Sequence, residues 1–187
     1  MSNNTDYVTT GKPKTTGAIF YAPKGTVLPT SADTDLDKAF TCVGLISDSG
    51  MKRSIKRTTK EIKDWGGNTV KVVQTEVKET FAFSMIEALN AAVQKVLYGE
   101  SNVTGDLASG LNVKHDSSDP EEHAWVIDQV MSNGDFYRIV IPSGKVTDTD
   151  DVSYKPDEPI AYGVTITAIS DGAGDTSNDY FKAKASV

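Results

Sequence analysis

The apolar residues of this chain fall mostly in short alternating runs, which is the spacing of β-strands, and only one segment has helical spacing. The strand-like runs lie at residues 17–22, 40–46, 69–83, 107–115, 124–131, 136–141 and 161–169. Ser47-Asp48-Ser49-Gly50 and Pro142 are expected to end strands, and Asn133-Gly134 predicts a type I′ hairpin turn. The pattern predicts a mainly β protein: an antiparallel β-sandwich or barrel with one flanking α-helix and a long protruding loop or hairpin.

The helical segment is predicted at residues 84–98. Ser84 and Glu87 have the Ser-x-x-Glu spacing of a capping box, and Gly99 stands where a left-handed residue ends a helix. An apolar stripe with spacings of three and four residues is formed by Ile86, Leu89, Val93, Val96 and Leu97. We expect this stripe to pack on a sheet and to hold no cofactor.

The run 69–83 changes the parity of its apolar residues. Val70 and Val72 share one face, whereas Val77 and Phe81 continue the parity that begins at Val73. Because one extra residue shifts a strand to the other face, we predict a β-bulge at Val72-Val73. The opposite, wettable set of the same run is Gln74, Glu76, Lys78 and Thr80.

Residues 51–68 form a basic segment in a chain whose formal net charge is −7. Its large apolar side chains are sparse, so it cannot cross a core as a central strand, and Gly66-Gly67 provides a turn. A two-stranded hairpin exposed alone is marginal in water. The segment is therefore either a solvated loop or a structure held by another molecule. Its charged and aromatic candidates for a contact are Lys52, Arg53, Lys56, Arg57, Lys60, Lys63 and Trp65.

Length and composition narrow the class of protein. A chain of 187 residues suits one domain, which we place at residues 17–187 after a polar arm at 1–16 that has neither helical nor strand periodicity. The negative net charge argues against a protein that binds nucleic acid tightly. The single cysteine, Cys42, excludes an intramolecular disulfide. No run is apolar enough for a membrane span, and no signal peptide is seen, so we expect no membrane partner.

Catalytic and metal-binding patterns are weak. Glu121-Glu122-His123 follows a turn and fits a solvated loop better than an acid–base set. Asp148, Asp150 and Asp151 lack the glycine and the distal glutamate of a calcium loop. We therefore expect no enzyme, no catalytic residue, no cofactor and no metal site. A rival interpretation is a monomeric carbohydrate-binding or adhesion β-module that uses Trp65 and Trp125 as sugar platforms.

Three features point to self-assembly: the arm, the basic segment, and acidic stretches that could receive that segment from a neighbour. Complementary patches at different places on one molecule give rings or stacks. The acidic candidates are Asp148, Asp150 and Asp151, with Asp157-Glu158 nearby.

The order of elements resembles that of the major tail proteins, or tail tube proteins, of bacteriophages with long non-contractile tails. The resemblance begins near Gly17 and is carried by Thr80-Phe81-Ala82-Phe83 leading into 84–99. It continues through Arg138-Ile139-Val140-Ile141-Pro142-Ser143-Gly144-Lys145-Val146, Asp151-Val152-Ser153-Tyr154 and Ile160-Ala161-Tyr162-Gly163-Val164-Thr165-Ile166-Thr167-Ala168.

The resemblance implies a structural virion subunit that forms hexameric rings, stacked around a tape-measure protein, and a conduit for DNA ejection. It implies that 51–68 reaches the adjacent ring and that 1–16 bridges subunits. Further implied partners are the tail terminator and the tail-tip or baseplate proteins, with DNA passing transiently and non-specifically after assembly in the host cytoplasm. The candidates to face the lumen are Gln74, Glu76, Lys78, Thr80, Thr165 and Thr167.

Overall fold

The computed structural model describes residue 3 and residues 5–15 and 17–184. Residues 1, 2, 4 and 16 of the predicted arm, and 185–187 of the predicted domain, lie outside the described residues. Short 3-10 turns occur at Thr5–Tyr7 and Glu100–Asn102. The main elements are β1 (Gly11–Pro13), β2 (Ile19–Pro23), β3 (Thr41–Cys42), β4 (Ile46–Lys63), β5 (Thr69–Met85), α1 (Ala91–Tyr98), β6 (Val103–Thr104), β7 (Asn112–Val113), β8 (Glu122–Met131), β9 (Phe136–Thr149), β10 (Tyr162–Ala168) and β11 (Asn178–Lys182).

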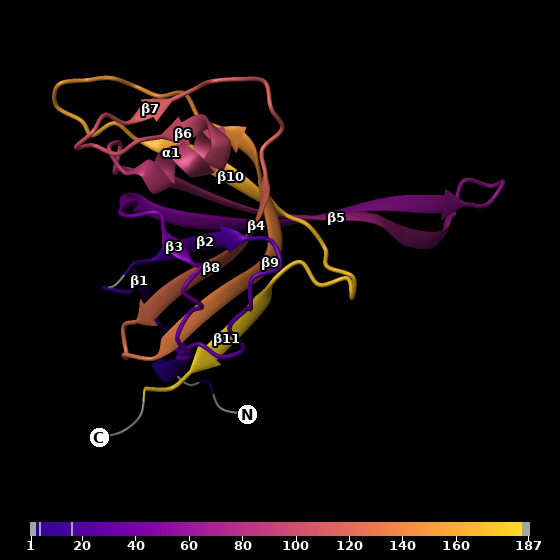
Figure 1. The fold of residues 1–187 in the computed structure, drawn as a ribbon. Helices are drawn as coiled ribbons and strands as arrows, with labels where there is room; N and C mark the ends of the chain where they lie inside the picture. The colour runs from indigo at the N-terminus through magenta and orange to yellow at the C-terminus, as the bar shows by residue number, and fades with distance from the viewer. Residues whose placement is uncertain (1–2, 4, 16, 185–187) are drawn as a thin grey trace.

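One antiparallel sheet of nine strands dominates the fold (Figure 1). Its order is β3-β2-β8-β9-β10-β5-β4, with β1 beside β8 and β11 beside β9, and β6 and β7 form a separate pair. The sheet is strongly curled. The ring centroid of Phe83 on β5 lies 6.4 Å from that of Trp125 on β8, although three strand spacings would separate these strands by roughly 14 Å in a flat sheet. The expected mainly β antiparallel fold, with one helix and a protruding hairpin, is confirmed.

The core fills the inside of this curl. Trp125 is completely buried and donates its indole N–H to the carbonyl oxygen of Gly144 at 3.1 Å. Helix α1 contributes Ala92, Val93 and Val96 to the same cluster. The larger side chains that surround them come from the strands: Ile19, Tyr21, Phe81, Phe83, Met85, Ile127, Ile139, Ile141, Val146, Val164 and Ile166.

The predicted helix is correct in kind but begins too early. Ser84 and Met85 still belong to β5, because they pair with Gly163 and Tyr162 of β10. The helix starts at Ala91, and its N-cap is Asn90, whose side chain accepts a hydrogen bond from the backbone N–H of Ala92 at 2.9 Å. The predicted capping box is therefore wrong. The Glu87 carboxylate instead accepts from the backbone N–H of Leu45 at 2.8 Å, and Leu89 of the expected stripe is exposed.

Two predicted strand ends are also wrong. Residues 47–50 do not end a strand: Ile46 pairs with Met85 and Met51 with Phe83, so the turn-forming residues make a wide bulge inside β4. Pro142 lies within β9, at a register shift between β8 and β9. On the other side of β9, the pairing with β11 stops at Val140 and that with β10 starts at Gly144, so the missing N–H of proline breaks no ladder there.

The turn between β8 and β9 differs from the predicted type. Gly134 has φ of 90°, whereas no other type of residue in the described chain has positive φ. A type I′ turn would require positive φ at Asn133 as well. The connection is instead a longer one that is closed by the N–H of Met131 bonding to the carbonyl of Asp135 at 2.8 Å.

Gly144 offers a test of the packing inside the curl. A Cβ atom there would stand 2.9 Å from Trp125 Cδ1 and 2.9 Å from Ile166 Cγ2, and both side chains are fully buried. We expect Gly144→Ala to lower the free energy of unfolding by about 1–3 kcal/mol, because overpacking forces core side chains out of their rotamers. Urea unfolding measures this change in the free energy of unfolding. Gly172→Ala, where nothing lies within 4 Å of the added atom, is the control; equal losses would contradict the packing argument.

Candidate assembly surfaces

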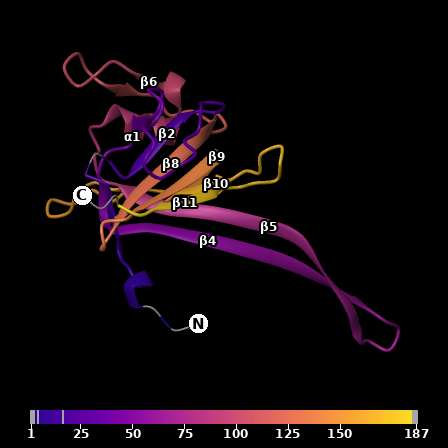
Figure 2. The ribbon, with the colours of Figure 1, turned by 90° about the horizontal axis from the view of Figure 1, so that it is seen from below.

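The most prominent surface is a hairpin that extends away from the body (Figures 1 and 2). It consists of the distal parts of β4 and β5, residues 55–79, which we call the hairpin shaft together with its tip at 64–68. In β5, residues 80–85 pair with β10, so Thr80 is the paired residue nearest the hairpin tip. Beyond it, in the described chain, β4 and β5 pair only with each other. The predicted basic segment is therefore the outgoing strand and turn of a long two-stranded ribbon.

The tip is a tight turn. The Asp64 carboxylate accepts hydrogen bonds from the backbone N–H of Asn68 at 2.8 Å and from its side-chain amide at 3.0 Å. These bonds hold the pKa of Asp64 below its ordinary value, so the tip keeps a negative charge at neutral pH. Gly67 has φ of 86°, which suits glycine. Trp65 projects from this turn and is 105% exposed.

A bulge lies in the shaft, but not where the parity change predicted it. Thr58 pairs with Glu76 and Thr59 pairs with Gln74, so the extra residue is Thr75. A second register shift lies nearer the tip, between Ile62 and Lys63. The bulge turns Gln74 to the face opposite Glu76, which splits the predicted wettable set. Arg57 confirms the new register by donating to the Gln74 amide oxygen at 2.8 Å.

The shaft carries cations without partners. Lys56 lies directly opposite Lys78, and like charges in that position repel each other. Among the described residues, no carboxylate lies within 4.0 Å of the ammonium group of Lys56, Lys60, Lys71 or Lys78 on the shaft, or of Lys52 just before it. Only Lys63 has a local carboxylate, that of Glu61 at 3.6 Å. The shaft thus presents positive charge that is not neutralised within the chain.

The shaft also exposes more apolar surface than an isolated strand pair can cover. Its large apolar residues are between 36% and 62% exposed: Ile55, Ile62, Val70, Val72, Val73 and Val77. They lie on both faces of the ribbon. The described part of the chain supplies no second layer of structure that would cover them. Several exposed large apolar side chains on one projection are typical of an interaction site.

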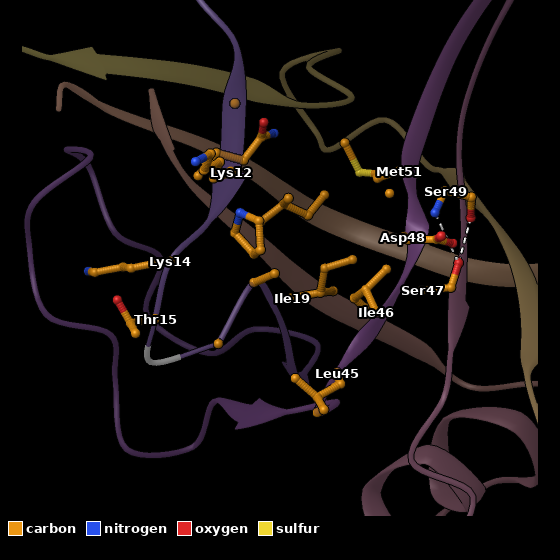
Figure 3. Close-up of a pocket in the computed structure, with 18 residues that line it drawn as sticks. Lys12, Lys14, Thr15, Ile19, Leu45, Ile46, Ser47, Asp48, Ser49 and Met51 are labelled. Carbon is orange, nitrogen blue, oxygen red and sulfur yellow. Dashed lines mark hydrogen bonds between the residues drawn. The ribbon is translucent and has the colours of Figure 1, made fainter. Parts of the chain in front are cut away.

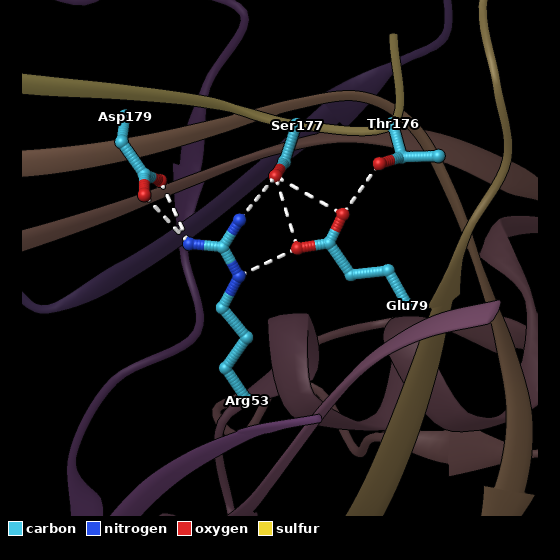
Figure 4. A network of polar contacts seen from close by, with 5 residues as sticks. All are labelled: Arg53, Glu79, Thr176, Ser177 and Asp179. Carbon is cyan, nitrogen blue, oxygen red and sulfur yellow. Dashed lines mark hydrogen bonds and ion pairs between the residues drawn. The ribbon is translucent and has the colours of Figure 1, made fainter. Parts of the chain in front are cut away.

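The shaft is anchored to the body through Arg53 (Figure 4). Its Nε donates to Glu79 Oε1 at 2.5 Å, and its Nη1 donates to Asp179 Oδ2 at 2.7 Å. Ser177 accepts from Nη2 at 2.8 Å, and Thr176 donates to Glu79. Glu79 is only 3% exposed. Arg53, one of the predicted contact residues, is thus already bound by the segment at 176–179.

Removing the charge of Glu79 tests this anchor. Glu79→Gln keeps the shape but weakens the bond from Arg53, so we expect the free energy of unfolding to fall by about 1–3 kcal/mol in a urea titration. Glu76→Gln, on the exposed shaft, is the matched control and should change it by less than about 0.5 kcal/mol. Similar effects of the two variants would contradict the anchoring role.

Acidic side chains are located at the other end of the molecule. Asp148 is the next-to-last residue of β9, and Asp150 and Asp151 begin the connection to β10. All three are exposed, and no cation lies within 4.0 Å of them among the described residues. The connection from 150 to 161 lies on the side of the body opposite the hairpin tip in both views (Figures 1 and 2). Unpaired cations and unpaired carboxylates therefore occupy opposite ends of one chain.

The threonines proposed for the lumen lie together on the outer face of the sheet. Thr167 pairs with Thr80, and Thr165 with Ala82, so their side chains share the face opposite the core. The Thr167 hydroxyl is 2.7 Å from that of Thr147. Glu76 and Lys78 continue this face along the shaft, whereas Gln74 does not.

The arm is partly built into the sheet, which its sequence did not predict. Gly11, Lys12 and Pro13 form β1 and pair with residues 129–131 of β8. Before β1, Tyr7 and Val8 are 85% and 83% exposed. Strand pairing with a distant partner gives this short polar stretch an order that its own periodicity does not contain.

A groove of about 680 Å³ lies between β1 and the start of β4 (Figure 3). Ile19, Ile46 and Met51 line it with apolar atoms, and Leu45 stands exposed beside it. Its charged lining residues are Lys12, Lys14 and Asp48. Sequence reasoning missed the groove because its lining comes from three separate segments, residues 11–19, 44–51 and 127–129.

A comparison with protein families identifies this architecture. The model of a family described as phage tail tube protein matches residues 1–184. The chain belongs to this phage tail tube protein family. It is accordingly a structural component of the virion tail and not an enzyme, as the sequence resemblance implied.

Comparisons with individual proteins are weaker. A chain in the virion of a native gene transfer agent particle aligns with a TM-score of 0.43 and 9% identity, over 79% of this chain and 92% of that one. A chain in the tail of an empty gene transfer agent particle, obtained by helical refinement with C6 symmetry, gives 0.43 and 8%, over 82% and 91%. No curated protein matches. No helix in the described part of the tail tube protein is long and apolar enough to cross a membrane.

The residues considered for other functions make structural contacts within the chain. Glu122 binds Lys24 at 2.6 Å and Ser143 at 2.8 Å on the surface. His123 is buried against Tyr21 and Trp125, with ring centroids 5.2 and 6.1 Å away. Trp125 is inaccessible and cannot be a sugar platform. In the described residues, no group of three His, Cys, Asp or Glu side chains is arranged to hold a metal.

His123 should make the stability of this tail tube protein depend on pH. Burial lowers the pKa of His123 below its ordinary value of 6.5, although the nearby Glu121 and Glu100 carboxylates oppose the shift. The unfolded chain therefore binds a proton at a higher pH than the folded one, so stability is full above about pH 6.5 and is lost as the pH falls through the lower, folded-state pKa. Urea midpoints between pH 7.5 and 5 should show a smaller loss in His123→Gln than in the wild type; parallel profiles would contradict this.

Proposed function

We propose that this tail tube protein forms hexameric rings that stack around a tape-measure protein and leave a conduit for DNA ejection. The observation that carries the proposal is the position of the hairpin shaft, which is cationic and partly apolar, at the end of the chain opposite the exposed carboxylates of 148–151. Complementary surfaces at opposite ends of a subunit join head to tail, and such heterologous contacts propagate into stacks.

The stacking contact uses the shaft and the acidic connection. Lys52, Lys56, Lys60 and Lys63, together with Arg57, face the Asp148, Asp150 and Asp151 of the subunit in the next ring, and Trp65 leads the contact. Arg53 supports it indirectly by fixing the shaft to the body. The exposed valines and isoleucines of the shaft become covered there, which supplies the second layer that a lone ribbon lacks.

Within a ring, the free edges of the curled sheet adjoin those of neighbouring subunits, which removes edges that would otherwise pair non-specifically. The arm at 1–16 bridges subunits. Thr80, Thr165 and Thr167, with Glu76 and Lys78, face the lumen. Gln74 does not join them, because the bulge at Thr75 turns it away. A hydroxyl-rich wall on a protein of net charge −7 holds passing phosphates weakly.

Other partners follow from this role. The tape-measure protein occupies the lumen during assembly in the host cytoplasm, and the tail terminator and the tail-tip or baseplate proteins close the two ends. DNA then passes transiently and without sequence-specific contacts. The exposed shaft at one end and the acidic connection at the other would meet different closing proteins.

Charge reversal on the shaft tests the stacking. We expect the double variant Lys56→Glu, Arg57→Glu to abolish or shorten tubes in negative-stain micrographs. The free energy of unfolding from urea titration should stay within about 0.5 kcal/mol of the wild type, because both side chains are exposed. Lys38→Glu, Lys184→Glu changes the net charge equally at exposed positions off the shaft and should leave tubes intact. Tubes of unchanged length in the shaft variant would remove these residues from the interface, and a wild-type protein that stays monomeric and binds glycans would overturn the function.

A further inference from the structure

We infer that Trp65 at the tip of the hairpin inserts into the groove between β1 and β4 of a second copy of this chain. The inference rests on the proposed stacking and assigns it a specific anchor. It depends on three observations: an aromatic side chain that is fully exposed, a cavity that no described residue of its own chain fills, and the distance between the two.

The groove has the properties of a pocket for one large side chain. Its volume of about 680 Å³ lies within the range of small-ligand sites. Figure 3 shows Ile19, Ile46 and Met51 directed into the same space, so its interior is apolar. Asp48 and Gln129 also line it and offer oxygen acceptors for an indole N–H. A tryptophan needs this combination when it is buried.

Trp65 has the properties of an interface anchor. It is 105% exposed, whereas the only other tryptophan, Trp125, is completely buried. Moving an exposed indole from water into an apolar pocket lowers the free energy of the complex. Tryptophan is also enriched among the residues that dominate binding energy. The turn that presents it is fixed by the bonds from Asn68 to Asp64. Little freedom is therefore lost when the tip docks.

The charges around the two partners match. Lys12 lines the groove, and in the described chain no carboxylate lies within 4.0 Å of its ammonium group. Asp64 precedes Trp65, carries a negative charge, and has no cation within that distance among the described residues. Docking the indole brings the Asp64 carboxylate to the wall that holds Lys12. Such pairs fix register more than they add affinity.

Trp65 cannot reach the groove of its own chain. Met51 lines the groove and starts the straight run of β4, and the tip follows about 14 residues later. At ~3.3 Å per residue, the tip lies up to roughly 46 Å from the groove. Figure 1 shows the tip and the start of β4 at opposite ends of the molecule. Only another copy can bring Trp65 to this site, and the repeat between successive grooves cannot exceed that span.

Tryptophan fluorescence during assembly tests the contact. The difference between wild-type and Trp65→Phe spectra isolates the emission of Trp65, because Trp125 is common to both. We expect a water-exposed, red-shifted emission in dilute protein and a clear blue shift in assembled protein. Trp65→Ala should raise the concentration needed for polymerisation by about tenfold or more, as the loss of an anchor residue does. Val70→Ala, also on the exposed shaft, is the control and should have a smaller effect.

Thiol cross-linking locates the docking site. In a Cys42→Ser background, Lys63→Cys beside the tip and Lys12→Cys in the groove should be joined between copies by a short bifunctional maleimide. The pair Lys63→Cys with Lys38→Cys should not be joined. A blue shift with cross-links only in the second pair, or polymers in which Trp65 remains water-exposed, would overturn the groove contact and leave ring stacking standing. Failure of the wild type to polymerise at any concentration would overturn both.

Discussion

A two-stranded ribbon has two faces and no second layer, and this constraint governs the structure of the tail tube protein. The hairpin shaft pairs only within itself beyond Thr80 and exposes valines and isoleucines on both faces. Hydrogen bonds along the ribbon do not compensate for that exposed apolar area. A polar anchor, Arg53 with Glu79 and Asp179, lies at the point where the ribbon leaves the body.

The body of the protein, unlike the ribbon, encloses its apolar side chains in a core. Its sheet curls until β5 and β8 face each other, and Trp125 fills the space between them. Because the curl does not close, the start of β4 remains apart from β1, and an apolar groove separates these strands. The same strand thus borders the groove at its beginning and supports an exposed tryptophan at its end. One subunit would thus carry both halves of the head-to-tail contact that we propose, and such a contact allows an open, growing assembly.

Charge and packing have separate tasks in this arrangement. In the stacking that we propose, the unpaired lysines of the shaft favour approach to the carboxylates around Asp150, and such interactions act over about 10 Å before salt screens them. In the tip contact that we propose, apolar burial acts only at short range and supplies the binding energy. The outer face with Thr80, Thr165 and Thr167 takes part in neither of these proposed contacts, which agrees with the proposal that it faces the lumen.

Local patterns predicted a good part of this structure. The alternation of apolar residues located most strands, Gly66-Gly67 located the turn at the tip, and the excess of lysine marked the shaft. Predictions that depended on where a strand stops were less accurate. Ser84 had the correct spacing for a capping box, yet pairing with Gly163 keeps it in β5, and Asn90 caps the helix instead. A ladder hydrogen bond to a neighbouring strand outweighs a local capping preference, and no local pattern records which neighbour will be present.

The sequence by itself determined the class of fold, the existence of a cationic projection and membership of a structural family, because these properties depend on composition and on spacing within a few residues. Only the tertiary structure decided that Arg53 is bound within the chain and that Gln74 lies on the face opposite Glu76. It also decided that Trp125 is buried while Trp65 is exposed, and that β1 and β4 border a groove. Each of these depends on the register between strands or on the curvature of the sheet. Both are set by contacts between residues far apart in the chain, which alternation along a single strand cannot specify.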